Sequence, residues 1–259
     1  MTRSLVTGAG KRLGRAMALY LAARGHDVAL HFASSRNEAL QVADEIRAMG
    51  RRAEVLQADL LDEDQTAALF PAARAALDGP ITCLINNASI FEYDTIHSAT
   101  RRNWDRHMDS NLRAPFLLTQ AMADQGLEPT VDSMGEPVAS GLIVNMIDQR
   151  VRKLTPEFMT YTLAKMGLWT LTQTTARALA PAIRVNAIGP GPTLRGARQT
   201  EQHFAAQRAT TILARGANPA DVTAALGYFL DAPAVTGQLL CVDGGQHLGW
   251  RTPDVQGSE

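Results

Sequence analysis

Short apolar segments alternate with longer amphipathic segments along most of the chain. The apolar segments are rich in Val, Ile and Leu, as expected of strands that are buried on both faces. The spacing between most of them leaves room for a crossover helix, which neighbouring parallel strands require. We therefore predict an α/β fold with a parallel sheet of about seven strands and helices on both faces. The predicted strands are Ser4–Thr7, Asp27–Phe32, Ala53–Gln57, Ile81–Asn86, Gly141–Ile147, Ile183–Ile188 and Gln238–Val242.

The segments between the predicted strands carry the apolar spacing of amphipathic helices. Gly25, Gly50 and Gly79 follow three of these segments at the position where glycine commonly ends a helix. Neither a repeat nor a low-complexity linker interrupts the alternation, so residues 1–259 are expected to form one domain. Helices are predicted at Lys11–Arg24, Asn37–Met49 and Glu63–Leu77, and another after Pro156 that runs to about Leu179.

Two segments depart from the alternation. Asp124–Ser140 is polar and contains Pro and Gly, so a loop insertion is expected there. Gly189–Asn218 begins Gly-Pro-Gly-Pro and has a helical pattern around Thr200–Arg208. Long excursions in a compact domain are more often functional lids than idle connections. We expect residues 189–218 to form a substrate loop, and a tolerated surface insertion is the alternative, which fits the first segment better.

Composition and charge exclude several classes of protein. Hydrophobic residues make up 46% and charged residues 20%, and the formal net charge of −1 gives no electrostatic footprint for nucleic acid or an anionic membrane. Cys83 and Cys241 have no metal-ligand spacing, so neither a metal site nor a disulfide scaffold is predicted. The N-terminal segment lacks a secretory pattern, and no stretch approaches the ~20 apolar residues that span a bilayer. A cytoplasmic protein is expected.

A glycine-rich turn, Thr7–Gly14, follows the first predicted strand and opens the first predicted helix. Glycines there let the backbone approach a pyrophosphate, whose charge is favoured at a helix N-terminus. The turn therefore predicts a dinucleotide site that includes Gly8, Gly10, Arg12 and Leu13, although an ordinary flexible turn would show the same pattern.

The end of the second predicted strand suggests which dinucleotide binds. NAD sites usually place a carboxylate here, whereas NADP sites use hydroxyls and positive charge. Ser34, Ser35 and Arg36 follow the strand without a carboxylate, and Arg12 could join them at a 2′-phosphate. This pattern favours NADPH. A polar turn with Ser35 or Asn37 as helix N-cap is a second interpretation that is compatible with the first.

Asp59 follows the third predicted strand, in the sequence Ala58-Asp59-Leu60. A carboxylate at this place can accept a hydrogen bond from the amino group of an adenine. It can equally cap the helix that begins near Glu63. We place Asp59 and Leu60 at the cofactor site and leave the capping alternative open.

Tyr161 and Lys165 are four residues apart in the predicted helix that follows Pro156, so they share one helical face. A phenol with a pKa near ~10 is a poor proton donor at neutral pH, and a neighbouring ammonium would lower that pKa. Asp148 stands just past a predicted strand, where parallel sheets place their ligands. A chance Tyr–Lys pair and a solvated strand-end carboxylate are the alternatives.

Taken with Asn86-Asn87-Ala88, Asn111 and Pro190-Gly191, these motifs resemble those of the short-chain dehydrogenase/reductase superfamily, in the same order. The resemblance covers nearly the whole chain, through to Val242-Asp243-Gly244-Gly245. It implies a single Rossmann-type domain and hydride transfer from a nicotinamide cofactor. For catalysis it implies that Tyr161 donates the proton, that Lys165 binds the nicotinamide ribose and lowers the Tyr161 pKa, and that Asn111 holds a relay water. For the cofactor it implies that Asn87 and Ala88 line its site and that Pro190 and Gly191 lie near the nicotinamide.

Two residues depart from the family pattern. Arg12 replaces the middle glycine of the turn, and Asp148 replaces the catalytic serine. An ionised carboxylate cannot donate a hydrogen bond to a substrate carbonyl, so ordinary ketone reduction is in doubt. With Ser89 and Phe91, both departures look like the pteridine reductases. That resemblance implies a catalytic Asp-Tyr-Lys triad and NADPH as the cofactor. It also implies that Ser89 lines the substrate pocket, that Arg12 reaches cofactor phosphate and substrate, and that a pterin binds between the nicotinamide and Phe91.

The stacking role of Phe91 has an alternative, because an aromatic residue in a loop is commonly an anchor packed into the core. Stacking on a flat heteroaromatic ring would contribute roughly 0.5–1.5 kcal/mol beyond area burial. We expect an NADPH-dependent reductase of dihydropterin or dihydrofolate in which Asp148, Tyr161, Lys165 and Asn111 are catalytic, and Arg12, Ser89, Phe91, Asp148 and Tyr161 bind substrate. A general carbonyl or 3-oxoacyl-thioester reductase is the runner-up, and a non-enzymatic NADP-binding module comes third.

The predicted helix up to Leu179 has apolar residues on more than one side, among them Met166, Leu168 and Trp169. A helix with only solvent on its outer face does not show this pattern. The family resemblance implies a tetramer packed through such helices, and a helix buried within a monomer would look the same.

Overall fold

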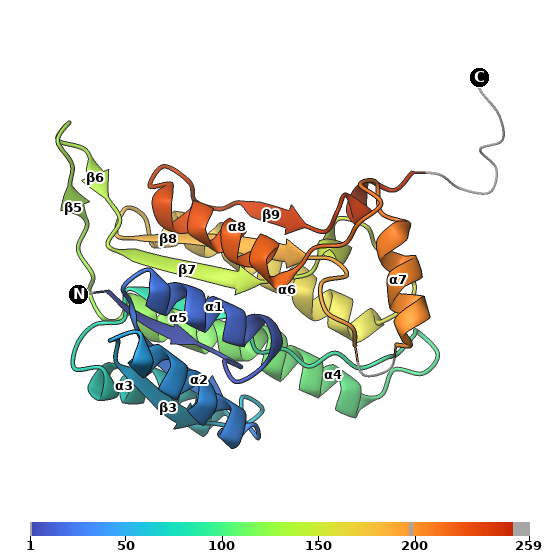
Figure 1. Ribbon diagram of the computed structural model, residues 1–259, viewed down its shortest axis with the longest axis horizontal. Coiled ribbons are helices and arrows are strands. Elements are labelled where there is room, and N and C mark those ends of the chain that lie inside the picture. The colour runs from blue at the N-terminus through green and yellow to red at the C-terminus, as the bar shows by residue number, and fades with distance from the viewer. Residues whose placement is uncertain (1, 197–198, 251–259) are drawn as a thin grey trace.

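Seven parallel strands form the central sheet of the computed structural model, which describes residues 2–196 and 199–250 (Figure 1). The strand order is β3-β2-β1-β4-β7-β8-β9, and every pairing within this sheet is parallel. The α/β fold predicted from the alternating pattern is therefore confirmed. The strands are β1 (Arg3–Val6), β2 (Asp27–Phe32), β3 (Ala53–Gln57), β4 (Cys83–Asn86), β7 (Gly141–Met146), β8 (Ile183–Pro190) and β9 (Leu239–Val242).

Helices cover both faces of the sheet (Figure 1). On one face α1 packs against α2 and α8, and on the other α3 contacts α5 while α4 contacts α6. A π-helical turn joins α4 to α5, and short 3₁₀ turns follow β7 and β9. The helices are α1 (Arg12–Ala23), α2 (Arg36–Ala48), α3 (Glu63–Ala76), α4 (Arg101–Met108), α5 (Ala114–Ala123), α6 (Met159–Ala178), α7 (Glu201–Ala209) and α8 (Pro219–Asp231), and the turns are Asp109–Arg113, Gln149–Val151 and Gln246–Leu248.

The hydrophobic core is divided by the sheet into two layers. Successive residues of a strand point to opposite faces, so Leu30 joins the layer under α1 and α8 whereas Ala29 joins the layer under α3 and α5. All six residues of β2 and of β7 are buried. This explains why the strands read as continuous apolar runs rather than as alternating ones.

The chain changes direction across the sheet between β1 and β4. From β1 it proceeds to β2 and β3 on one side, and from β4 to β7, β8 and β9 on the other. In open parallel sheets, ligands bind outside the carboxyl ends of the strands at such a switch point. The glycine-rich turn after β1 and the Asn87-Ala88 segment after β4 both lie there.

Two parts of the chain differ from the expectations. The segment Asp124–Ser140 was expected to be a loop, but it contains an antiparallel hairpin of β5 (Thr130–Val131) and β6 (Pro137–Val138), which projects at the end of the sheet away from α7 (Figure 1). Its turn closes because the Asp132 carboxylate accepts backbone hydrogen bonds from Met134 and Glu136, at 2.8 and 2.9 Å. Helices α4, α5 and α8 were not predicted.

Every helix in the described part of the chain is too short or too polar to cross a lipid bilayer.

His26, at the start of β2, makes the stability of the fold dependent on pH. Its Nδ1 lies 2.7 Å from the Ser4 hydroxyl oxygen on β1, and only 7% of the residue is exposed. Burial, helped by the positive charge of Arg24, lowers the His26 pKa from the ordinary 6.5 to about 4. Between these two values the unfolded chain binds a proton that the folded chain does not, so the free energy of unfolding falls as the pH falls.

The variant His26→Asn keeps an amide beside Ser4 and does not titrate. Between pH 7 and pH 4.5 we expect its free energy of unfolding to fall by roughly 2–3 kcal/mol less than that of the wild type. Urea denaturation at the two pH values measures this difference. Equal losses in the two proteins would show that His26 is not the titrating group.

Candidate active site

A cavity of about 550 Å³ lies at the switch point, outside the carboxyl ends of the strands. It brings together residues from segments far apart in the sequence. Of the predicted site residues, Gly10, Arg36 and Asn111 do not line it. The predicted residues on its wall are Gly8, Arg12, Leu13, Ser34, Ser35, Asp59, Leu60, Asn87, Ala88, Ser89, Phe91, Asp148, Tyr161, Lys165, Pro190 and Gly191.

The glycine turn is packed so tightly that two of its glycines cannot be replaced without strain. Gly8 has φ +63°, in the left-handed region, and a Cβ added to Gly14 would lie 2.0 Å from the Gly8 carbonyl oxygen. The Asn87 side-chain amide donates to the Thr7 carbonyl at 2.8 Å. Gly10 packs against Ser35 instead, because a Cβ added to Gly10 would lie 2.9 Å from the Ser35 hydroxyl oxygen. The close packing produces a backbone cradle at the N-terminus of α1.

Arg12 ties this turn to the expected substrate loop. Its φ of +53° shows why the family has glycine at this position, since a side chain there costs roughly 1–2 kcal/mol. The guanidinium donates to the backbone carbonyls of Arg195 and Leu194 at 2.8 and 3.0 Å. Arg12 therefore lines the cavity and also holds residues 194–195 beside the turn. Residues 197–198 of the expected loop lie outside the described part of the chain.

His31 also lines the cavity, and the sequence reasoning missed it. Its ring is 1% exposed, Nδ1 accepts a hydrogen bond from the Gly8 N–H at 3.1 Å, and Nε2 lies 3.0 Å from the Ala58 carbonyl oxygen. Because Gly8 can only donate, Nε2 carries the proton and donates to Ala58. Burial lowers the His31 pKa, which keeps this tautomer neutral. The available signal was a polar residue near the end of an otherwise apolar strand.

The turn after β2 presents hydroxyl groups to the cavity. Ser35 occupies the N-cap position of α2, but its side chain makes no capping hydrogen bond. Asn37 lies inside the helix, so the alternative N-cap assignment to Asn37 is wrong. Glu38, the first carboxylate after the strand, forms an ion pair with Lys11 at 2.7 Å. Its negative charge is therefore balanced beside the glycine turn.

Asp59 does not cap α3, so the capping alternative is wrong. The N-cap of this helix is Asp62, whose carboxylate accepts from the Gln65 N–H at 3.1 Å. The Asp59 carboxylate accepts from the Leu61 N–H at 3.0 Å and lines the cavity.

Tyr161, Asp148 and Lys165 meet at the innermost part of the site, where β7 ends and α6 passes. The Tyr161 hydroxyl donates to Asp148 Oδ2 at 3.0 Å, and Asp148 Oδ1 accepts from the Arg150 N–H at 2.8 Å. Lys165 donates from Nζ to the Met146 carbonyl at 2.8 Å and lies 5.6 Å from the centroid of the Tyr161 ring. The i, i+4 spacing and the position after β7 thus place all three side chains together.

The ionisation of this cluster is controlled by burial and by Asp148. Burial, followed by the charge of Asp148 and its hydrogen bond, holds the Tyr161 pKa well above its ordinary value. The expected lowering of that pKa by Lys165 is therefore wrong for these side chains: the phenol donates to a carboxylate, and the Lys165 ammonium faces a backbone carbonyl. Burial also raises the Asp148 pKa and lowers that of Lys165 to about 8.

Phe91 packs on another ring and also faces the cavity, and its expected stacking on a substrate stays a prediction. Its ring stacks on Phe158 with centroids 4.3 Å apart and planes 9° apart, as an anchor would. It is nevertheless 45% exposed, lines the cavity and meets Tyr161 edge-on at 4.7 Å. Ser89, on the same segment, also lines the cavity, and its hydroxyl opposes the rise of the Tyr161 pKa less than any other group that acts on it. Phe158 was not predicted, because no local pattern indicates a ring that packs on a residue far away in the chain.

Asn111 lies in the π-helical turn, is fully buried and does not reach the cavity wall. Its Nδ2 donates to the Ile90 carbonyl and its Oδ1 accepts from the Ile90 N–H, both at 2.8 Å. The observed effect is a clamp on the segment that carries Ser89 and Phe91. The expected role in holding a relay water stays a prediction.

The sequence of this chain is similar to those of known reductases. A family model described as Enoyl-(Acyl carrier protein) reductase matches residues 8–247. The 3-oxoacyl-[acyl-carrier-protein] reductase FabG of Staphylococcus aureus is 31% identical over 254 residues, which cover 96% of this chain and 99% of that protein. The chain belongs to the short-chain dehydrogenase/reductase family.

Two solved structures are more similar in sequence to this chain than FabG is. FolM alternative dihydrofolate reductase 1 from Brucella suis, in complex with NADP, is 41% identical, with a TM-score of 0.90 over 98% of both chains. The protein of the same description from Brucella canis, also complexed with NADP, is 40% identical, with a TM-score of 0.88 over 98% of this chain and 97% of that one. The relatives thus differ in the substrates that their names give, while both of these structures hold NADP.

Gly14→Ala tests the cradle. The added methyl group would collide with the Gly8 carbonyl and force the turn open, so we expect the affinity for a nicotinamide dinucleotide to fall by at least about tenfold, or 1.4 kcal/mol. Fluorescence titration measures the affinity. Gly50→Ala is the control, because Gly50 has φ +77° with open space around it, far from the cavity wall. It should lose about 1 kcal/mol of stability and bind the dinucleotide normally. A folded Gly14→Ala protein with unchanged affinity would contradict the expectation.

Proposed function

We propose that this protein is an NADPH-dependent reductase that transfers a hydride to a pterin-type ring, in a dihydropterin or a dihydrofolate. The observation that carries the proposal is the Tyr161–Asp148 hydrogen bond of 3.0 Å, which puts a carboxyl group where the family resemblance implies a serine. The similarity to two FolM alternative dihydrofolate reductases supports the same substrate class.

The residues present fit the cofactor. The cradle at Gly8 and Gly14 admits a pyrophosphate next to the N-terminus of α1, whose partial positive charge favours it. Ser34 and Ser35 supply hydroxyls for a 2′-phosphate, and Glu38 is held by Lys11. NADPH supplies the hydride when bound. Asp59, Asn87 and Lys165 would hold its adenine, its central part and its nicotinamide ribose.

The ionisation states of Tyr161 and Asp148 indicate where the proton for the substrate comes from. Reduction of a carbon–nitrogen double bond in a pterin puts hydride on carbon and requires a proton on the ring nitrogen. Tyr161 is held as a neutral phenol, and the raised pKa of Asp148 makes its carboxyl group easier to protonate than an exposed one. Asp148 with Tyr161 can therefore deliver the proton, while Lys165, fixed on the Met146 carbonyl, orients the cofactor.

A planar substrate also suits the wall beside Tyr161. The partly exposed Phe91 ring offers an aromatic surface next to the phenol, worth roughly 0.5–1.5 kcal/mol for an offset stack. Arg12 reaches the same cavity from the glycine turn. Its fixed guanidinium would contact cofactor phosphate and substrate.

A carbonyl or 3-oxoacyl-thioester reductase is the second candidate. The 31% identity to FabG and the presence of Tyr161 and Lys165 favour it. Asp148 disfavours it, because an ionised carboxylate accepts rather than donates a hydrogen bond. A non-enzymatic NADP-binding module would not need the Tyr161, Lys165 and Asp148 cluster at all.

The test is NADPH oxidation by the purified protein with dihydrobiopterin, dihydromonapterin and dihydrofolate, compared with an acetoacetyl thioester and simple ketones. We expect turnover with pterins only. Turnover confined to carbonyl compounds would overturn the proposed substrate class. Tight NADPH binding without turnover of any substrate would favour the binding module.

The role of Asp148 is tested by Asp148→Ser in the same assay. Because the serine hydroxyl can donate to a ketone but is a poor acid, we expect pterin turnover to fall by roughly 10²–10⁴-fold and ketone turnover to appear. Asp148→Asn is the matched control, since it keeps the size of the side chain and removes its acidity. A serine variant that reduces pterins at the wild-type rate would contradict the acid role.

We further propose that the chain assembles into a homotetramer, through an apolar groove between α4–α5 and α6, and that it acts in the cytoplasm, where its two cysteines stay reduced. The groove has a volume of about 450 Å³ and is lined by Met108, Leu112, Arg113, Phe116, Gly167, Thr170, Leu171 and Thr174.

Sedimentation equilibrium tests the assembly, with about four times the chain mass of 27.9 kDa expected for the wild type. A charge at Phe116, which is 37% exposed in the groove, should weaken the contact because its burial costs free energy and the neighbouring Arg113 is already ion-paired with Glu63. Phe116→Asp is therefore expected to be smaller than the wild type. Met134→Asp, on the projecting hairpin, is the control and should assemble normally. A monomeric wild type would contradict the proposal.

A further inference from the structure

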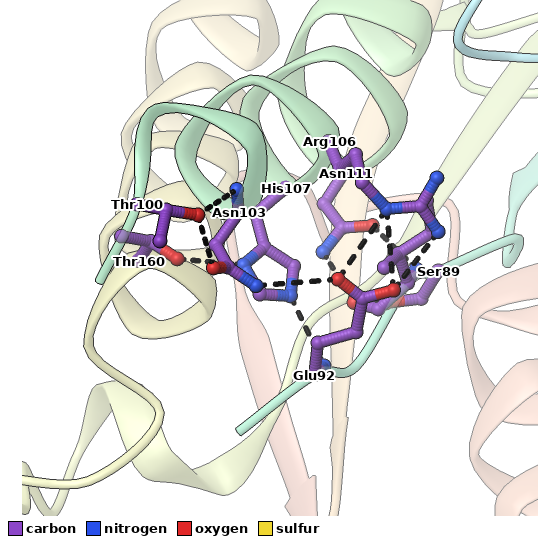
Figure 2. Close-up of polar contacts among 9 residues, drawn as sticks. Ser89, Glu92, Thr100, Asn103, Arg106, His107, Asn111 and Thr160 are labelled. Atoms are coloured by element: carbon purple, nitrogen blue, oxygen red, sulfur yellow. Dashed lines mark hydrogen bonds and ion pairs between the residues drawn. The ribbon is translucent and has the colours of Figure 1, made fainter. Parts of the chain in front are cut away.

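His107 lies on α4 between the two segments that carry the principal site residues (Figure 2). Its ring is fully buried, with Nε2 3.1 Å from the backbone nitrogen of Glu92 and Nδ1 2.7 Å from the Thr160 hydroxyl oxygen. Glu92 directly follows Phe91 in the chain, and Thr160 directly precedes Tyr161. One imidazole therefore bridges the neighbour of the cavity-lining ring and the neighbour of the phenol.

The direction of each hydrogen bond in this bridge is determined. The Glu92 N–H can only donate, so Nε2 accepts and the ring proton sits on Nδ1, from which it is donated to Thr160. The Thr160 hydroxyl then donates to the carboxylate of Asp94, which also accepts the Thr160 N–H at 3.2 Å. Asp94 and Thr160 are 1% and 2% exposed. A buried chain with every partner assigned holds a single geometry.

The Phe91 side of the bridge is clamped from α4 and the turn after it. The Glu92 carboxylate forms an ion pair with Arg106 at 2.9 Å, one residue before His107 (Figure 2). The Asn111 side chain holds Ile90 through both of its backbone polar groups. Phe91 thus lies between two residues whose backbone positions are set by side chains of one helical segment.

The Tyr161 side is clamped from Asp94. Its carbonyl accepts from the Phe158 N–H at 2.8 Å, and Phe158 begins α6 with a left-handed φ of +55°. The Phe158 ring in turn stacks on Phe91. The start of α6 is therefore fixed relative to the loop after β4 by the Asp94 carbonyl and by the stack of Phe158 on Phe91.

His107 itself does not contact the reacting atoms. Its ring meets the Tyr161 ring edge-on with centroids 5.9 Å apart, while both of its nitrogens are engaged by Glu92 and Thr160. The ionisable groups that act on it are Asp94, Glu92, Arg106 and Lys165, and burial outweighs them by lowering its pKa. The neutral imidazole thus acts as a two-ended spacer and not as an acid or a base.

We propose that His107 is a positioning residue that sets the separation between Tyr161 and Phe91, with the Nδ1 end controlling proton transfer and the Nε2 end controlling how the flat substrate is held. The inference rests on the proposed function, because Phe91 faces the substrate only if a planar ring binds there. If His107 has this role, the hydrogen bond of Nδ1 to Thr160 and that of Nε2 to Glu92 can be removed one at a time with different effects on the reaction.

Two nearly isosteric variants make this separation. In His107→Asn the side-chain amide reaches the place of Nδ1 and keeps Thr160 while losing Glu92. In His107→Gln the amide reaches the place of Nε2 and keeps Glu92 while losing Thr160. We expect the Asn variant to raise KM for a dihydropterin by roughly 3–10-fold and to keep kcat within about twofold of the wild type. We expect the Gln variant to lower kcat by roughly 3–10-fold and to keep KM within about twofold. Both magnitudes correspond to the loss of one hydrogen bond.

Thr160 provides matched controls, because its hydroxyl is one link of the chain. Thr160→Val removes that hydroxyl and should reproduce the kcat defect of His107→Gln. Thr160→Ser restores the hydroxyl and should restore kcat. The Kd for NADPH, measured by fluorescence, should be unchanged in all four variants, since none of the changed residues lines the cavity.

A readout without turnover keeps the test decisive. Tyrosine labelled with ¹³C at Cζ reports the Tyr161 environment by NMR, with Tyr161→Phe used to assign the signal among the four tyrosines. The signal should move in His107→Gln and Thr160→Val and stay in place in His107→Asn and Thr160→Ser. An unmoved signal in all variants, or parallel changes of kcat and KM in both His107 variants, would overturn the positioning role.

Failure of the proposed function would look different. In that case the wild-type protein would leave dihydropterins unreduced, and the variants would be assayed with the carbonyl substrate that it does reduce. The loss of kcat in His107→Gln and the NMR signal would still report the Nδ1 end.

Discussion

The hydrogen bond between the Tyr161 hydroxyl and the Asp148 carboxylate joins the two elements on which the site depends, the end of β7 and the helix α6. Burial of this pair controls the states of both groups. The phenol keeps its proton because burial, followed by the negative charge of Asp148, raises its pKa, and the carboxyl group becomes easier to protonate because burial penalises that charge. Lys165 cannot reverse this balance from its position on the Met146 carbonyl.

This interaction is possible only because the backbone brings the segments to one edge of the sheet. The contact of Gly14 with the Gly8 carbonyl draws α1 against β1, and the Asn87 amide ties the turn to the end of β4. Arg12 then connects the same turn to residues 194–195. Its left-handed backbone costs some stability, which the two hydrogen bonds from the exposed guanidinium offset only in part, since water screens them.

Much of the fold could be predicted because the strands are buried on both faces and therefore read as uninterrupted apolar runs. Helix α4 was missed because it is short and polar, and the π-helical turn Asp109–Arg113 breaks the apolar period that would have joined it to α5. The hairpin β5–β6 was missed because its strands are two residues long.

The site shows where sequence reasoning stops. Asp148 follows β7 and Pro190 ends β8, and the carboxyl ends of parallel strands lie at the same edge of the sheet, so their convergence was predictable. The roles of His31, Phe158 and His107 depend on contacts between side chains from distant segments, which no local pattern reveals. The direction of the Tyr161 pKa shift was missed for a related reason. Spacing shows that Lys165 is near, but not that the phenol proton points to Asp148.

The difference between a carboxyl group and a hydroxyl at position 148 also limits the choice of substrate. A serine hydroxyl stays protonated at all working pH values and stabilises a carbonyl oxygen by donation alone. A carboxyl group with a raised pKa is protonated more readily than an exposed one, which suits a substrate nitrogen that ends the reaction protonated. Because burial of the same site causes both the raised pKa and the neutral phenol, the ionisation of the pair and the proposed choice of a nitrogen acceptor have one physical origin.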